Sequence, residues 1–586
     1  MQLGPDGRLQ RDGLELELNP YCRRAVSKGV ELARARGATC TVFTLGPPSA
    51  EDVLREAVAW GADDAVLISD PAFAGSDTLA TARALAAALR REGPFNLVLA
   101  GRNSVDADTG QVGPEVAELL DFTFLGGVLE LEVEFDDAAG AMVRARCEYD
   151  DGWLTAQAAL PALVSCAERL CEPAKVDPIR RAAVPPGRIR ILKSADLGKG
   201  EGPWGQAGSP TRVGDVRVLE VDRARKVLSG PVHEQVRHAV ALLVDRGGLV
   251  CDADADATPV LEQVAHSDNN RGPAIVVVLE AERTREAREL LGTAARLSAD
   301  IGGRVVALCA AGLAAMAAVV SSWGADEIVT MVGSSVAEDV ARTVAAWCTA
   351  QRPWALLAGG TMWGREVGSR VAARLGAGLT GDAVDLSVQG GRLVAWKPAF
   401  GGRLVAAIHS ESPVQLATVR PGILALYAPR PGTAVPTTTL SVEPRGRVEY
   451  LEGARDDELD DLARAAVVIG IGMGVAPDEY DDLQPLRARL AAELAATRKV
   501  TDKGWMPRAR QVGITGRSIS PRLYVAIGIS GKFNHMVGVR GAGVIVAINP
   551  DRDAAVFESS DIGIVADWRE AVPVFLAEIN RRCTRS

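Results

Sequence analysis

The sequence predicts an α/β protein with two related, doubly wound parallel-sheet domains and a third, Rossmann-like domain at the C-terminus. Three observations predict this architecture. Short apolar runs alternate with amphipathic helical stretches along most of the 586 residues, which is the pattern of parallel strands covered by helices. Landmarks of the first half recur in the second half in the same order. Near the C-terminus, three apolar runs end in small or polar residues, as ligand-facing strands of open α/β sheets do.

The first repeat contains two apolar runs, residues 40–46 and 95–101, that we expect to be buried strands. Between them, residues 49–63 and 76–93 place their apolar side chains at helical spacing. Apolar strands that are separated by helices in this way belong to a parallel sheet with both faces covered.

The second repeat shows the same elements in the same order. Residues 304–310 and 354–360 read as strands, and residues 336–353 read as the helix that precedes the second strand. The tetrapeptide Trp60-Gly61-Ala62-Asp63 recurs as Trp323-Gly324-Ala325-Asp326, at a similar distance from the following strand. We therefore interpret the chain as two copies of one α/β domain in tandem.

A Pro-, Gly- and Thr-rich stretch from Tyr427 separates the second repeat from a third α/β unit. In that unit, residues 529–535 leave an apolar run and enter a predicted helix. Small residues at such a turn let backbone N–H groups approach a phosphate at the helix N-terminus. Asn549 and Asp567 each follow an apolar run, where they could contact an adenosine ribose or cap a helix.

Composition excludes several classes of function. The net charge of −10 argues against a general nucleic-acid binder, and the sequence has no run of about 18 apolar residues that would predict a membrane span. The histidines and acidic runs lack metal-ligand spacing, so we expect no metal site. Nine cysteines without a C-x-x-C pair, and no signal-peptide pattern, favour reduced thiols and a cytoplasmic location.

Longer strings in the C-terminal unit carry a family resemblance. The strings TRKVTDKGWMP from Thr497, QVGITGRSISPRLYVAIGISGKFNHMVGV from Gln511 and VIVAINPDRDAAVFESSDIGIVADW from Val544 resemble the FAD-binding domain of the electron transfer flavoprotein α subunit. PAFGGRLVAAIHSESPVQLATVRPG from Pro398 resembles the first domain of that subunit. The first 250 residues resemble the β subunit through LNPYC, GRNSVDADTGQVGPEVAELL and RLCEPAKVDPIRR.

The resemblance covers nearly the whole chain and implies a fusion of the β subunit and the α subunit, in that order. It implies two adenine nucleotide alpha hydrolase-like domains and a C-terminal FAD-binding domain of Rossmann-like, DHS type. The expected divisions are a β-like domain (1–196), a β-like C-terminal arm (197–252), a linker (253–272), α-like domain I (273–450) and the FAD-binding domain (451–586).

The resemblance also implies which side chains tune the flavin. Arg498 matches an arginine that lies against the flavin ring, where a fixed guanidinium favours reduced flavin. Thr515 matches a hydroxyl near flavin N5, and His535 matches a histidine at the pyrimidine O2 edge, where a positive or donor group acts in the same sense. The implied set of cofactor-binding residues is Met473, Thr497, Arg498, Gln511, Val512, Gly513, Ile514, Thr515, Ser530, Gly531, Lys532, Phe533, Asn534, His535, Asn549, Asp567 and Trp568.

The chain departs from the family pattern at three places. Met473 stands where the family has an arginine that contacts FAD, and Ile514 stands where a glutamine is usual. The β-like half also lacks the apolar strand that opens the family's β subunit and lines its nucleotide pocket. We expect these changes to affect the flavin potential, the affinity for FAD and the occupancy of the β-like pocket.

A loop in the β-like half resembles the loop that wraps AMP in the β subunit. Three states of this pocket follow from the resemblance: a structural AMP, an empty pocket, or a second FAD together with use of NADH. We expect one FAD per chain and do not expect a second. The residues that would contact AMP are Gly101, Asp106, Asp108, Gln111, Val112, Gly113 and Pro114.

The resemblance finally implies a redox carrier rather than an enzyme with its own small-molecule substrate. Leu170 matches the loop that inserts an apolar anchor into a flavoprotein dehydrogenase, here one of the acyl-CoA dehydrogenase type. The expected acceptor is a quinone oxidoreductase or another electron acceptor. Two alternatives remain, namely an electron-bifurcating, NADH-using flavoprotein with two FAD, and a nucleotide-binding scaffold that has lost redox function.

Overall fold

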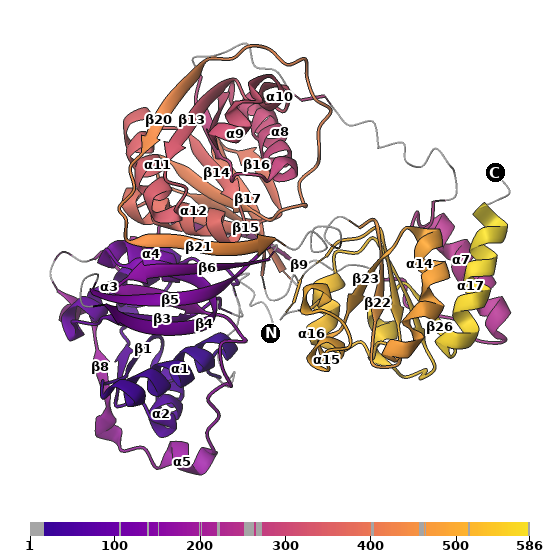
Figure 1. The fold of residues 1–586 in the computed structure, drawn as a ribbon, viewed down its shortest axis with the longest axis horizontal. Coiled ribbons are helices and arrows are strands. Elements are labelled where there is room, and N and C mark those ends of the chain that lie inside the picture. The colour runs from indigo at the N-terminus through magenta and orange to yellow at the C-terminus, as the bar shows by residue number, and fades with distance from the viewer. Residues whose placement is uncertain are drawn as a thin grey trace. The chain divides into compact units, whose positions relative to one another are not determined.

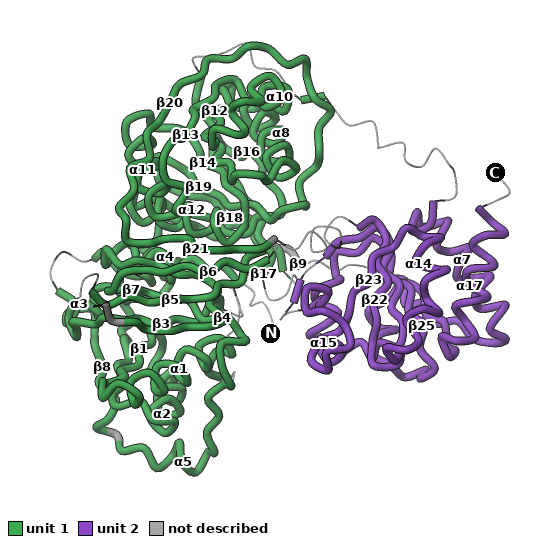
Figure 2. Tube along the Cα trace, in the orientation of Figure 1, with its two compact units in different colours: residues 1–217, 261–400, 404–454 green, residues 218–260, 401–403, 455–586 purple. Residues whose placement is uncertain are grey.

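The fold is described from a computed structural model of the chain. It describes residues 17–583 except 105–106, 137–139, 151, 199, 201, 219–222, 251–262, 265–271, 400–403, 456–461, 463–464, 514–515 and 518. The chain forms two compact units, which are described separately (Figure 2). Unit 1 holds residues 1–217, 261–400 and 404–454, and unit 2 holds residues 218–260, 401–403 and 455–586.

The first domain of unit 1 comprises the described residues up to 217, and it has two sheets (Figure 1). One sheet has the order β1-β2-β8 and the other the order β21-β6-β5-β4-β7-β3, in which β21 (Val448–Arg455) comes from the end of the second domain. Its elements are α1 (Pro20–Arg36), β1 (Thr41–Leu45), α2 (Glu51–Trp60), β2 (Asp64–Ile68), α3 (Thr78–Glu92), β3 (Leu97–Gly101), α4 (Val112–Leu120), β4 (Thr123–Asp136), β5 (Gly140–Tyr149), β6 (Gly152–Ala159), β7 (Ala162–Cys166), α5 (Pro178–Ala182), β8 (Ile189–Leu192), α6 (Gly205–Gly208) and β9 (Thr211–Val218).

The second domain comprises the described residues of unit 1 from 272 to 454, and it has a seven-stranded sheet of order β15-β19-β14-β11-β12-β13-β20. Every neighbouring pair in that sheet is parallel, as the repeat pattern predicts. Its elements are β11 (Ala274–Val278), α8 (Thr284–Ile301), β12 (Arg304–Ala310), α9 (Ala311–Ala314), α10 (Ala317–Ser322), β13 (Glu327–Gly333), α11 (Ala337–Gln351), β14 (Ala355–Gly359), α12 (Met362–Leu375), β15 (Leu379–Ala383), β16 (Asp385–Gln389), β17 (Arg392–Ala399), β18 (Leu404–Ser410), β19 (Gln415–Val419), β20 (Thr437–Val442) and β21 (Val448–Arg455).

The two repeats differ at the centre of the sheet. In the second domain, β11 is hydrogen-bonded to β12 on one side and to β14 on the other. The matching strands of the first domain, β1 and β3, belong to different sheets, and no strand among the described residues lies between them. The side chains of β1 and β3 are accordingly half-buried, whereas those of β14 are all buried.

The two domains of unit 1 exchange edge strands. β21, which follows the second domain in sequence, adds to β6 of the first domain, and β9, which follows the first domain, adds to β18 of the second. Strand addition satisfies backbone hydrogen bonds along both edges, so each domain helps to complete a sheet of the other.

Unit 2 has one parallel sheet of order β10-β26-β25-β24-β22-β23. The fully buried strands β22, β24 and β25 form its centre, with an apolar cluster on each face. Its elements are β10 (Lys226–Val227), α7 (Val232–Asp245), β22 (Val467–Ile471), α14 (Gln484–Leu490), β23 (Glu493–Ala496), α15 (Arg498–Asp502), β24 (Leu523–Ile527), α16 (Phe533–Met536), β25 (Val544–Asn549), β26 (Ile562–Val565) and α17 (Trp568–Cys583).

The segment predicted as an arm (197–252) contributes to both units. β9 adds to the sheet of the second domain, whereas β10 pairs with β26 in unit 2. In α7, the buried Gln235 side chain accepts from the Val565 N–H at 2.9 Å and donates to the Val565 carbonyl at 3.2 Å. This amide continues the pairing along β26 beyond the end of β10 and fixes α7 against the sheet.

Two further findings concern the described residues only. Among them, no helix has the length and hydropathy needed to cross a membrane, and no three His, Cys, Asp or Glu side chains gather as a metal site would require.

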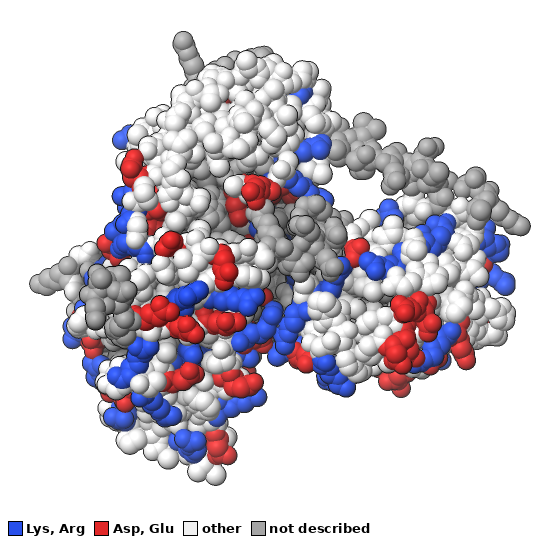
Figure 3. Space-filling model, in the orientation of Figure 1, with Lys and Arg blue, Asp and Glu red and all other residues white. Residues whose placement is uncertain are grey.

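Seven described cysteines are free thiols, but Cys583 is disulfide-bonded, so the expectation of reduced thiols fails at that position. On the visible face, acidic and basic side chains are interspersed over the first domain and over unit 2 (Figure 3).

Candidate functional site

The candidate site lies at the carboxyl edge of the parallel sheet of unit 2. β23 lies on one side of β22, and β24, β25 and β26 lie on the other, so the strand order reverses at β22. In open α/β sheets, ligands bind outside the carboxyl ends of the strands at such a reversal. Met473, Arg498 and Ser530 follow the carboxyl ends of β22, β23 and β24, so the topology brings these predicted residues to one edge.

The turns after β22 and β24 pack backbone against backbone. A Cβ atom added to Gly472 would lie 2.0 Å from the carbonyl oxygen of Gly528, and Gly528 itself has a φ of +63°. Glycine is therefore required at both positions. This close packing keeps side chains out of the edge and leaves backbone groups there for a ligand.

Polar side chains of the second turn face solvent. Ser530, Lys532 and Asn534 are exposed, whereas Gly531 between them is buried. The predicted helix that follows is α16, which is a single turn of four residues. Its dipole is therefore weaker than that of the longer helix expected from the sequence. A phosphate at this turn would depend on the backbone N–H groups and on the charge of Lys532.

Arg498 begins α15 at the end of β23, directly after Thr497. Its side chain is half exposed and its Nε lies 3.2 Å from Asp502, which also binds Arg508 at 2.5 Å. The guanidinium is thus held by a carboxylate one helical turn away, at the edge where the resemblance implies a flavin ring.

His535 is buried rather than directed to solvent, with 6% of its surface exposed. Its Nε2 lies 2.8 Å from the hydroxyl of Tyr524, and its Nδ1 lies 2.9 Å from the carbonyl oxygen of Val512. Burial lowers the pKa of His535 to about 4, while the bond to Val512 opposes this shift. At neutral pH the imidazole is uncharged, which differs from the positive group that the resemblance allows.

The loop that begins at Gln511 and leads from α15 to β24 is fixed through its first residues. Gln511 is 2% exposed and accepts a hydrogen bond from the Thr501 hydroxyl at 2.7 Å, so its amide oxygen serves the fold. The N–H of Val512 donates to the carbonyl of Ala496 at 3.0 Å. The predicted residues Ile514 and Thr515 lie outside the described residues, as does the side chain of Phe533.

The predicted cofactor-binding residues Asn549, Asp567 and Trp568 all have structural partners. Asn549 donates to the Ile529 carbonyl at 2.9 Å and accepts from the Asp551 N–H, which fixes the turn after β24. Trp568 is 4% exposed, and its indole N–H donates to the Gly474 carbonyl at 3.0 Å. Asp567 is half-exposed and pairs with Arg569 at 3.2 Å. Met473 is half-buried and packs on the core cluster beneath β22.

Sequence reasoning missed Tyr524, the residue that holds His535. It stands in the apolar run Leu523–Ile527, and a phenol in the middle of a buried strand needs a hydrogen-bond partner. A second signal is Gly470 in the neighbouring strand, where an added Cβ would lie 1.7 Å from the Tyr524 hydroxyl. A lone glycine in a buried strand indicates the close approach of another group.

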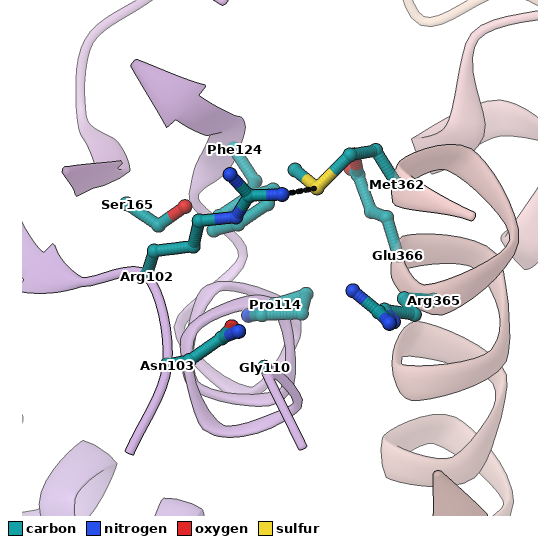
Figure 4. A pocket seen from close by; sticks show the side chains of 9 residues that line it. All are labelled: Arg102, Asn103, Gly110, Pro114, Phe124, Ser165, Met362, Arg365 and Glu366. Atoms are coloured by element: carbon teal, nitrogen blue, oxygen red, sulfur yellow. Dashed lines mark hydrogen bonds between the residues drawn. The ribbon is translucent and has the colours of Figure 1, made fainter. Parts of the chain in front are cut away.

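The loop that resembles an AMP-binding loop lies in unit 1, between β3 and α4, and borders a small cavity (Figure 4). In Figure 4, the guanidinium of Arg365 points from α12 into this space, and Arg102 bonds the Met362 sulfur at 3.6 Å. The cavity measures about 20 Å³, which is room for about one water molecule. Its lining residues are Arg102, Asn103, Gly110, Pro114, Phe124, Ser165, Met362, Arg365 and Glu366.

The remaining loop residues are held internally. Gln111 is 1% exposed and accepts from the Thr78 hydroxyl at 3.0 Å, while its Nε2 has no partner among the described residues. Asp108 has a φ of +47° and accepts from Asn103 at 2.6 Å. Gly101 ends β3, and Val112, Gly113 and Pro114 form the first turn of α4. Asp106 lies outside the described residues.

Leu170, the predicted anchor for the partner, is less accessible than Ile179, nine residues further along the chain. Leu170 is half-buried and packs on the apolar cluster of the first domain. Ile179, in the short helix α5 of the same segment, is 81% exposed. Sequence reasoning missed Ile179, although the flanking Asp177, Pro178 and Arg180 signal a surface helix.

Comparison with known proteins assigns both units. The electron transfer flavoprotein domain matches two separate stretches, residues 6–186 and 275–444, which confirms the internal repeat. The electron transfer flavoprotein FAD-binding domain matches residues 461–540, which contain the edge built around Met473, Arg498 and Ser530.

Individual relatives each match about half of the chain or less. Protein FixB of Clostridium saccharobutylicum is 32% identical over 51% of this chain and 93% of its own length. Protein FixB of Bradyrhizobium diazoefficiens is 38% identical over 39% of this chain and 65% of its own length. The electron transfer flavoprotein subunit alpha of Bacillus subtilis is 31% identical over 44% and 82% of the two chains. With its two domain matches and its FAD-binding domain in one polypeptide, the chain belongs to the electron transfer flavoprotein family.

Proposed function

We propose that this protein is an electron carrier that binds one FAD per chain at the edge of the unit 2 sheet. It accepts electrons from a flavoprotein dehydrogenase of the acyl-CoA dehydrogenase type and passes them to a quinone oxidoreductase or another acceptor. The observation that carries the proposal is the meeting of the glycine turns, Arg498 and Lys532 at one carboxyl edge, within the stretch matched by the FAD-binding domain.

The residues at this edge fit a flavin dinucleotide. The tight turns after β22 and β24 keep side chains away from the pyrophosphate path, and Ser530, Lys532 and Asn534 offer exposed donors along it. Bound FAD would supply the capacity to store electrons, which no amino-acid side chain at this edge has. Arg498 would place a positive charge where negative charge accumulates on reduction.

For the contact with the dehydrogenase, we propose a different anchor residue from the one that the sequence predicts. Because Leu170 is half-buried and Ile179 is 81% exposed, we favour Ile179 as the apolar anchor of this segment. An exposed apolar side chain flanked by charged residues resembles the small, central contacts that dominate many interfaces.

The side chains around the cavity of unit 1 suit an anion such as AMP, but the cavity itself is small. Arg102 and Arg365 each have a buried Nε without a partner among the described residues, which suits an anionic ligand. The cavity of about 20 Å³ beside them is too small for a nucleotide. An AMP held by Gly101–Pro114 would therefore have to lie along another part of the loop.

The test of the carrier function is reduction by a donor under anaerobic conditions. A catalytic amount of an acyl-CoA dehydrogenase with its substrate should bleach the flavin absorbance of the purified chain, and a quinone oxidoreductase should restore it. A flavin that only a chemical reductant bleaches would contradict the proposed donor class. We propose a cytoplasmic location because seven described cysteines are free thiols, with the disulfide-bonded Cys583 as an exception among the described residues.

A further inference from the structure

In unit 2, Tyr524, His535 and the Val512 carbonyl form a buried hydrogen-bonded line. It runs from β24 to the loop that begins at Gln511. Tyr524 is fully buried, and its hydroxyl lies 2.8 Å from His535 Nε2. On the other side of the ring, Nδ1 lies 2.9 Å from the carbonyl oxygen of Val512, a residue with 1% of its surface exposed. The line thus joins a central strand, the single helical turn α16 and the start of the loop.

Hydrogen-bond chemistry fixes which ring nitrogen of His535 carries a hydrogen toward Val512. A carbonyl oxygen only accepts, so Nδ1 of His535 carries the hydrogen and donates it to Val512. Nε2 of a neutral imidazole then accepts, and the Tyr524 hydroxyl donates to it. Burial, which lowers the pKa of His535 to about 4, agrees with a neutral ring. Both ring nitrogens are therefore used inside the domain.

The neighbouring strand makes room for the phenol. Gly470 of β22 pairs with Ala526 of β24, and a Cβ atom at Gly470 would lie 1.7 Å from the Tyr524 hydroxyl. Any larger residue at position 470 would displace the hydroxyl. The hydroxyl of Tyr524 in β24 can therefore keep its position only because residue 470 in β22 is glycine.

The carbonyl at the end of the line belongs to a residue that is also fixed on its other side. The Val512 N–H donates to the Ala496 carbonyl, and the Gly513 N–H donates to the Arg517 carbonyl, both at 3.0 Å. Ala496 is the last residue of β23, directly before Thr497 and Arg498. Holding Val512 therefore holds the loop against the strand end that presents Arg498.

We propose that Tyr524 is a positioning residue for the flavin site: through a neutral His535 it fixes the backbone at Val512 and Gly513 beside the end of β23. His535 transmits this constraint and contributes no positive charge to the flavin. The inference rests on the proposed FAD site, but the hydrogen-bonded line itself can be measured without FAD.

The first test determines the tautomer of His535 in the flavin-free wild-type chain. The protein has five histidines, so ¹⁵N-labelled histidine gives few signals, and His535→Gln assigns the one of interest. The expected result at neutral pH is a neutral ring protonated at Nδ1. A ring protonated at Nε2, or at both nitrogens, would overturn the proposal.

The second test compares Tyr524→Phe with a matched variant, Tyr480→Phe. The Tyr480 hydroxyl is buried in the same unit and has no partner among the described residues. Loss of one buried hydrogen bond corresponds to about a tenfold change, so Tyr524→Phe should raise the FAD dissociation constant and the amide exchange rates of Val512 and Gly513 by about that factor. Tyr480→Phe should change neither.

Equal behaviour of the two variants would overturn the proposal. If the wild-type chain bound no FAD, the proposed function would fail, while amide exchange and the histidine spectrum would still decide the role of Tyr524. If Tyr524→Phe failed to fold, the tautomer in the wild-type chain would decide it alone.

Discussion

At the scale of single residues, the redox role that we propose for unit 2 depends most on Arg498. Replacing it with glutamine removes a positive charge beside the flavin, so reduction should become less favourable. A loss of about 1.4 kcal/mol would lower a two-electron potential by about 30 mV. Spectroelectrochemical titration measures the shift.

Arg508→Gln is the matched control for this prediction, because Arg508 binds the same carboxylate, Asp502, at 2.5 Å. The control should leave the potential unchanged. Equal shifts in both variants would show that the effect arises from Asp502 rather than from a guanidinium near the flavin.

A second residue-scale prediction concerns Glu286, a buried carboxyl in the second domain. Burial and the nearby Glu280 raise its pKa to about 8. Between the ordinary carboxyl pKa and about 8, the folded state therefore binds more protons than the unfolded state, and stability falls as the pH rises through this range. Glu286→Gln removes this dependence.

The measurement is chemical denaturation at two pH values. At pH 8.5, Glu286→Gln should be more stable than the wild type by about 1 kcal/mol or more, whereas at pH 5 the two should be similar. An equal difference at both pH values would mean that the carboxyl does not titrate as described.

At the scale of elements, residues of the arm are part of unit 2. Arg223 is 8% exposed and binds Asp561 at 2.8 Å, as well as the carbonyls of Arg540 and Ala542. Asp561 is 2% exposed and also binds the half-exposed Arg246 at 3.0 Å. The segment from Arg223 to Arg246 is thus tied to the strand β26 through one buried carboxylate.

Removing the buried arginine should be costly. Arg223→Met leaves Asp561 without its buried partner and should reduce the free energy of unfolding by about 3–5 kcal/mol. Arg246→Met breaks a solvent-accessible pair with the same carboxylate and should cost about 1 kcal/mol or less. Urea denaturation of both variants tests the difference, and equal costs would contradict the buried position of Arg223.

Local elements were predictable because their signals are local. The run 304–310 forms β12 over Arg304–Ala310, and the helical pattern at 336–353 forms α11 over Ala337–Gln351. The exchange of β9 and β21 between domains was not predictable, since strand pairing over hundreds of residues leaves no periodic signal in either strand.

The site was predictable to the level of its backbone turns and less so for its side chains. The turns after β22 and β24 follow from the glycines and from the parallel order of the strands. The neutral state of His535 did not follow, since it depends on Tyr524 and on the Val512 carbonyl, whose proximity only the folded sheet creates.

At the scale of the whole molecule, the proposed partner contact lies in unit 1 and the proposed cofactor site in unit 2. Ile179→Ala should raise the KM for the donor dehydrogenase several-fold, as for an apolar contact at the centre of an interface, without changing the FAD content. Ile191→Ala, at a position that is 54% exposed in β8, is the matched control. A change in KM for Leu170→Ala but not for Ile179→Ala would restore the anchor that the sequence suggested.

The central claim is that one FAD binds per chain, in unit 2. The most direct measurement is the visible spectrum of the purified full chain, followed by denaturation and a count of the released flavin and AMP. We expect one FAD per chain and a flavin spectrum that Tyr524→Phe weakens at limiting FAD. A chain without flavin after reconstitution would contradict it and favour a scaffold without redox function. Two FAD per chain would contradict the count and make NADH the next reductant to test.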